Sequence, residues 1–140
     1  MLRLDDWGLD ALLLGHHLAY SENHYWRSQY SLSLPRLRPC TGGIEPTSPI
    51  SDKGLVQVIC AFRLFNEQLE KSLSTCENER FRDKLLPMGI THVSAGSSTE
   101  ASGYASPASQ LDQFEISDER SVVQVTEAIE NSGHTAVFKD

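Results

Sequence analysis

The chain has 140 residues, of which 39% are hydrophobic and 22% are charged, and its formal net charge is −7. This length allows one domain with a hydrophobic core, and no apolar run approaches the roughly 20 residues of a membrane span. The negative charge argues against nucleic acid and anionic membranes as main partners. Three cysteines, an odd number, behind an N-terminus unlike a signal peptide indicate a reducing cytoplasmic location.

The first half of the chain alternates helix, strand and helix. Asp5 or Asp6 caps a first helix that extends as far as Trp26, and its inward stripe consists of Leu9, Leu12, Leu13, His16 and Tyr20. Alternating apolar residues and serines predict a strand at 29–34, which the following prolines end. After a long loop, Ser51 caps a second helix with the apolar stripe Leu55, Val58, Ile59, Phe62 and Phe65.

The middle of the chain repeats this alternation. Residues 71–75 form a short predicted strand, and a capping box at Ser74–Glu77 begins a third helix that ends at Gly89. We expect that helix to turn Phe81 and Leu85 inward. Residues 90–94 form the next predicted strand, so each strand is followed by a glycine-rich or charged segment.

The last forty residues begin with a Ser-, Gly- and Ala-rich loop. Residues 111–116 are expected to be extended. Ser117 or Ser121 caps a last helix, which ends before Gly133 and directs Val122, Val125 and Ile129 inward. Residues 135–138 are expected to close the domain as a strand.

The alternation of helices and strands predicts an α/β fold with a parallel sheet. Only three or four strands are expected, whereas a closed (β/α)₈ barrel takes about 250 residues. The sequence therefore predicts part of a barrel. We expect residues 1–98 to form this partial barrel and residues 99–140 to form a separate C-terminal region.

Active sites of such barrels lie at the carboxyl ends of the strands, which directs attention to three segments. Arg36 and Arg38 follow the first strand and offer bidentate hydrogen bonds to a carboxylate, such as that of a bound amino acid. The alternative is that one arginine pairs with Glu45 or a helix acid as a structural contact. Ser94 and Ser97 offer hydroxyl and backbone groups to a bound amino acid, or form only a serine-rich turn.

The cysteines and histidines do not have metal-ligand spacing. Cys40, Cys60 and Cys76 lie 20 and 16 residues apart, whereas iron–sulfur and zinc ligands are gathered closely. Cys60 lies among apolar residues and is expected in the core. His16 falls on the apolar stripe of the first helix, where a satisfied core histidine is expected rather than a ligand.

Several motifs carry a resemblance. Ser-Leu-Pro-Arg-Leu-Arg-Pro-Cys at 33–40, Gly-Gly-Ile-Glu-Pro at 42–46, Ile-Cys-Ala-Phe-Arg-Leu-Phe at 59–65 and Ser-Ala-Gly-Ser-Ser-Thr-Glu at 94–100 resemble the C-terminal part of the 2-iminoacetate synthases. These are radical S-adenosylmethionine (SAM) tyrosine lyases of thiamine biosynthesis. The resemblance therefore adds the methionyl carboxylate of SAM to the anions that Arg36 and Arg38 are candidates to bind. The resemblance implies a SAM-type TIM barrel followed, at 99–140, by a region associated with biotin and thiamine synthesis.

The same resemblance implies cofactors and a partner that this chain meets only in part. The family uses SAM and a 4Fe-4S cluster held by three closely spaced cysteines, which are absent here, and it docks with a thiazole synthase. The family also usually has an arginine, expected to grip the substrate carboxylate, where this chain has Cys76. A thiol cannot replace a guanidinium as an anion clamp.

Two functional interpretations follow. In the first, the chain is the C-terminal segment of a lyase that cleaves tyrosine to 2-iminoacetate and p-cresol, working with a separate cluster-bearing N-terminal half. Within this interpretation, another aromatic amino-acid lyase of the same superfamily is the alternative to a tyrosine lyase. In the second, the chain is a truncated, inactive fragment that at most binds a partner.

Overall fold

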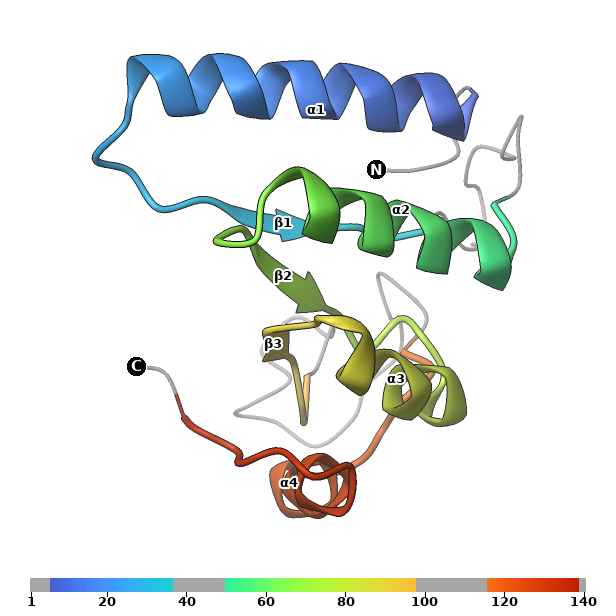
Figure 1. Cartoon of the computed structure of the whole chain (residues 1–140). Helices are drawn as coiled ribbons and strands as arrows, with labels where there is room; N and C mark the ends of the chain where they lie inside the picture. The colour runs from blue at the N-terminus through green and yellow to red at the C-terminus, as the bar shows by residue number, and fades with distance from the viewer. Residues whose placement is uncertain (1–5, 37–49, 98–115, 139–140) are drawn as a thin grey trace, which may run out of the picture.

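The structure is a computed structural model that describes residues 6–36, 50–97 and 116–138 (Figure 1). Helices and short strands alternate along these residues. Their order is α1 (Trp7–His24), β1 (Ser31–Ser33), α2 (Asp52–Phe65), β2 (Glu70–Leu73), α3 (Glu79–Leu85), the 3-10 helix η1 (Leu86–Met88), β3 (His92–Val93) and α4 (Val122–Asn131).

The three strands form one parallel sheet in the order β1-β2-β3. Helices α2 and α3 lie in the two connections, because parallel neighbours need a crossover. The predicted α/β class with parallel strands is confirmed. The carboxyl ends of all three strands therefore lie along the same edge of the sheet. Among the described residues β1 has β2 as its one neighbour, so the first strand is an edge strand.

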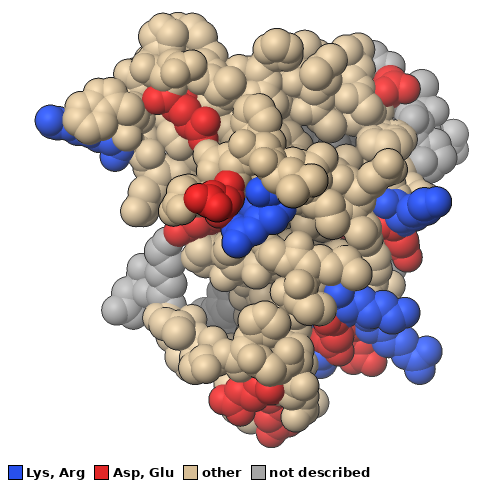
Figure 2. All heavy atoms as spheres, in the orientation of Figure 1, with Lys and Arg blue, Asp and Glu red and all other residues tan. Residues whose placement is uncertain are grey.

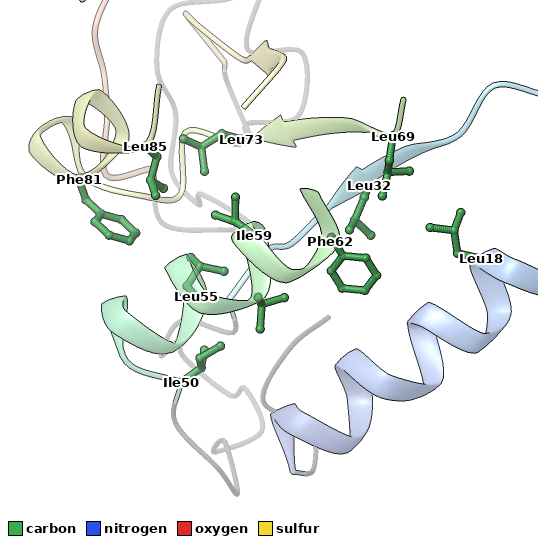
Figure 3. Close-up of a cluster of buried hydrophobic side chains, with 11 residues drawn as sticks. Leu18, Leu32, Ile50, Leu55, Ile59, Phe62, Leu69, Leu73, Phe81 and Leu85 are labelled. Atoms are coloured by element: carbon green, nitrogen blue, oxygen red, sulfur yellow. The ribbon is translucent and has the colours of Figure 1, made fainter. Parts of the chain in front are cut away.

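The helices cover one face of the sheet with a continuous apolar core (Figure 3). Leu32, Leu69 and Leu73 project from the sheet toward α2, whose Leu55 and Ile59 are 1% and 2% exposed. Burying a side chain of this size contributes about 1.5–3 kcal/mol. The predicted stripe of α2 is confirmed apart from Phe65, which is exposed at the end of the helix.

The opposite face of the sheet is polar. The register aligns Ser33 with Ser72 and Ser72 with His92, and it aligns Ser31 with Glu70. Nε2 of His92 lies 3.8 Å from a carboxylate oxygen of Glu70. Because bulky branched side chains normally fill the interior of a βα barrel, a row of serines, a glutamate and a histidine marks this face as one that meets polar groups.

The predicted inward stripe of α1 is wrong. Leu9, Leu12, Leu13 and Tyr20 are between 48% and 60% exposed, and His16 is also exposed rather than buried in the core. The face that contacts the core instead consists of Trp7, Ala11, Leu14 and Leu18. Apolar residues occupy a wide arc of this helix, so two stripes compete. The core formed by α2 and the sheet buries the stripe that ends in Leu18. The predicted cap is confirmed, since Asp6 accepts hydrogen bonds from the first turn.

The predicted start of the third helix is also wrong. Asn78 caps α3 by accepting a hydrogen bond from the Phe81 nitrogen at 3.0 Å, so the helix begins four residues after Thr75. The expected capping box does not form, because the Glu77 side chain is engaged by Arg36. Phe81 and Leu85 do face the core as predicted, and Gly89 ends the following 3-10 helix with a φ of 93°.

Three further expectations need correction or qualification. Cys60 is exposed on α2 and is not a core residue, because its neighbours Ile59 and Phe62 occupy the buried face. Residues 135–138 do not form a strand, although they line the same hollow as β3. In α4, Ser121 is the cap and Val125 is buried, but Val122 is 45% exposed. Residues 99–107 and 111–115 lie outside the described residues.

Within the described ranges 6–36, 50–97 and 116–138, none of the helices has the length and hydrophobicity needed to cross a membrane.

The exposed leucines of α1 and the free edge of β1 predict that the isolated chain is marginally stable and self-associates. Replacing both Leu9 and Leu13 with lysine should shift the chain toward monomer in light scattering. It should not lower the free energy of unfolding measured with urea, because both side chains lie outside the core.

A matched control is Val137→Lys, which changes an 85% exposed apolar side chain on the C-terminal segment and should leave self-association unchanged. A wild-type chain that is a monodisperse monomer with a cooperative transition of several kcal/mol would contradict the prediction.

Candidate functional site

The candidate site is the set of segments that follow the three strands, and we call it the strand-end site. It comprises Leu34–Arg36 after β1, Ser74–Glu77 after β2 and Ser94–Ser97 after β3. Of the predicted site residues, Arg36, Cys76, Ser94 and Ser97 lie in these segments. Arg38 lies outside the described residues, and its predicted role stays a prediction.

Arg36 connects the first two strand ends. Its Nε donates to Oε1 of Glu77 at 2.7 Å, and its Nη2 pairs with the other carboxylate oxygen of Glu77. Its Nη1 donates to Asp52 in the first turn of α2 at 2.7 Å. The guanidinium also lies over the ring of Phe81, 5.2 Å from its centroid. Asp52 is a helix acid of the kind that the sequence left open as an alternative partner.

The Arg36–Glu77 pair is almost completely buried, with 7% and 3% of the two side chains exposed. Hydrogen bonding to Glu77 raises the pKa of Arg36 and outweighs the opposing effect of burial. A bidentate fork of this kind fixes both position and orientation. The described contacts occupy all three guanidinium nitrogens, so Arg36 acts directly on Glu77 and affects Cys76 only through that neighbour.

Cys76 lies in a turn between β2 and α3 and is half-buried. Its backbone nitrogen donates to Oγ of Ser74 at 3.4 Å, a local bond that helps form the turn. Glu77, the next residue, is held by Arg36. The position of Cys76 is therefore fixed by the ion pair beside it, although its side chain carries no charge that would bind an anion.

The segment after β3 is held by an arginine that the sequence analysis missed. Nη2 of Arg82, on α3, donates to the carbonyl oxygen of Ser94, and Nη1 pairs with the carboxylate of Asp118. Arg82 is 1% exposed. Ser94 itself is exposed, and its nitrogen donates to the carbonyl oxygen of Leu73 at 3.1 Å. Ser97 is half-buried.

Asp118 and Arg120 complete this second charged cluster. Arg120 donates to Asp118 and, through Nη2, to Asp83 on α3 at 3.0 Å. Burial raises the pKa of Asp118, but hydrogen bonds from Arg120 and the positive charges of Arg82 and Arg120 outweigh it and lower that pKa to about 2. Because the unfolded chain binds this proton more readily, the carboxylate contributes stability above pH about 4 that is lost as the pH falls toward 2.

No local pattern in the sequence pointed to this cluster. Arg82, Asp118 and Arg120 look like ordinary surface residues of a helix and a loop. The available signal was weak: Arg82 lies next to Phe81 on the inward side of α3. A buried arginine needs a carboxylate, but the sequence does not say which of nineteen acidic residues supplies it.

Two hollows lie away from the strand-end site or at its margin. One, of about 610 Å³, is an apolar groove between α1 and α2, lined by Trp7, Ala11, Phe62 and Phe65 among others. Figure 2 shows few charged atoms over these two helices on the face in view, whereas acidic atoms gather over α4. The second, of about 510 Å³, lies between β3 and α4 and includes Ser94 in its lining.

The described cysteines do not form a metal site. Cys60 lies on the outside of α2 and Cys76 follows β2. Among residues 6–36, 50–97 and 116–138, no group of three or more histidine, cysteine or acidic side chains has the arrangement of a metal site. An iron–sulfur cluster therefore does not fit the residues that the structure describes.

The chain belongs to the Biotin and Thiamin Synthesis associated domain family, whose profile matches residues 33–135. It is 47% identical over 136 residues to the 2-iminoacetate synthases of Escherichia coli strain K12 and Salmonella typhimurium strain LT2. The match covers 97% of this chain but 36% of each relative, so the chain spans about a third of their length. The resemblance noted from the sequence motifs is confirmed.

Solved structures give the same result for the fold. The chain superposes on HydG, a maturase of the FeFe-hydrogenase, with a TM-score of 0.83 at 28% identity. HydG from Carboxydothermus hydrogenoformans gives a TM-score of 0.81 at 25% identity. Each superposition covers 95% of this chain and about 30% of the other chain. The prediction that the chain has the fold of part of a larger βα barrel is confirmed.

The Arg36–Glu77 pair predicts strong coupling between the two side chains. Arg36→Met or Glu77→Leu alone should lower the free energy of unfolding by about 3–5 kcal/mol, because each removes one half of a buried bidentate ion pair. The double variant should lose less than either single variant, since it leaves no buried charge. Urea titration followed by circular dichroism measures all three.

Asp52→Asn is the matched control. Asp52 contacts the same arginine, but its side chain is 63% exposed, so its loss should cost less than about 1 kcal/mol. Additive losses in the double variant would show that the pair is not coupled.

Proposed function

We propose that the chain is the C-terminal segment of a tyrosine lyase that cleaves tyrosine to 2-iminoacetate and p-cresol for the thiazole moiety of thiamine. The observation that carries this proposal is 47% identity to the 2-iminoacetate synthases over 97% of the chain. The position of the strand-end site supports it, because βα barrels bind substrates at the carboxyl ends of their strands.

In the full-length family, SAM and a 4Fe-4S cluster supply the radical that begins the cleavage. In this proposal the present chain contributes the side of the substrate pocket that does not carry the cluster. Ser94 and Ser97 offer groups to the amino acid, and Arg38 is the arginine best suited to a carboxylate, because Arg36 is already engaged by Glu77 and Asp52. The polar face of the sheet lies next to the strand ends and extends the same side of the proposed pocket.

The partners and location follow from the same proposal. Tyrosine is the substrate, a thiazole synthase is the protein that takes part in the next step, and a separate N-terminal half would supply the cluster. We expect a cytoplasmic protein that binds neither nucleic acid nor membrane, in line with its net charge of −7. The division at residues 98 and 99 stays a prediction, since residues 98–115 lie outside the described ones.

One observation favours a second candidate function, that of an inactive fragment that binds a partner. Cys76 occupies the position where the family usually has an arginine, so this chain lacks one expected contact with the substrate carboxylate. The exposed leucines of α1 would then bind another protein. The two candidates differ in whether a carboxylate-binding site is restored when the arginine is restored.

Joining this chain to the part of the Escherichia coli 2-iminoacetate synthase that it does not match provides the test. We expect the joined protein to bind tyrosine weakly in anaerobic calorimetry, and Cys76→Arg to raise the affinity about tenfold or more. A charged hydrogen bond contributes about 1.5–3 kcal/mol, which corresponds to that gain. The Cys76→Arg protein should also release p-cresol from tyrosine when SAM and a one-electron reductant are supplied.

Cys60→Arg is the matched control, because it adds the same charge on the exposed side of α2. It should leave tyrosine affinity unchanged. Absence of tyrosine binding in both the joined protein and its Cys76→Arg variant would exclude the lyase proposal and favour the inactive fragment.

A further inference from the structure

A short segment before α4 contacts two of the three strand ends through its backbone. The nitrogens of Ser117 and Asp118 donate to the carbonyl oxygen of Thr75, after β2, at 3.0 and 3.1 Å. The nitrogen of Gly96, after β3, donates to the carbonyl oxygen of Arg120 at 3.3 Å. Four consecutive residues, Ser117–Arg120, thus connect the segments that carry Cys76 and Ser94.

Side chains strengthen the same connection. The carboxylate of Asp118 is completely buried and pairs with Arg82, and the same guanidinium donates to the carbonyl oxygen of Ser94. Arg120, with 15% of its side chain exposed, donates to Asp118 and to Asp83. The charged groups around Asp118 therefore come from α3 and from its own segment, and they meet at the end of β3.

The arrangement is more specific than the stability of the fold requires. A buried ion pair contributes little net stability compared with well-packed apolar side chains, because desolvation offsets the attraction. Such a cluster does fix geometry, since each guanidinium needs its partners in defined directions. Its bonds reach backbone atoms of the segments after β2 and β3, and α2 takes no part in them.

We propose that Ser117–Arg120 is a positioning clamp that sets the separation between the segments Ser74–Glu77 and Ser94–Ser97. Asp118 is its central positioning residue and acts through Arg82 and Arg120. This inference rests on the proposed function, because it assigns the clamp to the two segments between which the amino acid would bind. The clamp explains how a segment far along the chain contributes to a site built from strand ends.

Hydrogen exchange on the 140-residue chain tests the clamp without any ligand. Asp118→Asn should raise the exchange rate of the backbone amides of Gly96, Ser117 and the substituted residue itself at least tenfold, and it should leave the amides of α2 unchanged. Arg120→Gln, which keeps the Arg82–Asp118 pair, should give a smaller effect at Gly96. Glu119→Gln removes the neighbouring exposed carboxylate and should change nothing.

Unchanged exchange at Gly96 in Asp118→Asn would overturn the proposal. Asp118→Asn could instead raise the exchange rate in every element, α2 included. In that case Arg120→Gln is the deciding variant. If Arg120→Gln raises the exchange rate of the α2 amides as much as that of Gly96, the cluster has a purely structural role and the proposal is overturned.

A second measurement links the clamp to the site. In the joined Cys76→Arg protein, Asp118→Asn should weaken tyrosine binding at least tenfold and leave p-cresol binding unchanged, because p-cresol has no amino-acid group for these segments to hold. Equal weakening of both ligands would overturn the positioning role. If tyrosine does not bind to the joined Cys76→Arg protein that keeps Asp118, the proposed function is excluded. The hydrogen-exchange result on the 140-residue chain would still test the positioning clamp.

Discussion

The buried pairing of Arg36 with Glu77 is the interaction on which the strand ends depend. It connects the segment after β1 to the segment after β2 by two hydrogen bonds from one guanidinium. A second buried arginine, Arg82, connects the segment after β3 to Asp118. Charges removed from water need partners in fixed directions, so the loops at this edge of the sheet are held in place while the apolar core lies below them.

One face of the sheet packs against the helices and stabilises the fold, whereas the opposite face carries polar side chains available for function. The face toward α1, α2 and α3 holds the apolar core and also the buried Lys71, whose Nζ donates to the carbonyl oxygen of Leu69. The other face aligns Ser33, Ser72 and His92 across the three strands, so it offers hydrogen bonds rather than packing. In a closed barrel this face would line the interior.

The sequence predicted the alternation of helices and strands from α1 to β3 and the parallel sheet, because these follow from local periodicity and from the crossovers that parallel strands need. It failed where tertiary contacts choose between local alternatives. Packing against the core selected the buried face of α1, and Arg36 pairs with Glu77, which the expected capping box would have used. Asp118 and Arg82 lie 36 residues apart, and no local pattern links residues at that distance.

The most direct test of the account is where tyrosine binds. Amide chemical shifts of the joined Cys76→Arg protein, followed by NMR as tyrosine is added, would locate the ligand. We predict shifts in the segments Ser74–Glu77 and Ser94–Ser97 and none in the groove between α1 and α2. Chemical-shift changes confined to that groove, with none in the two strand-end segments, would contradict the claim that these segments form an amino-acid site.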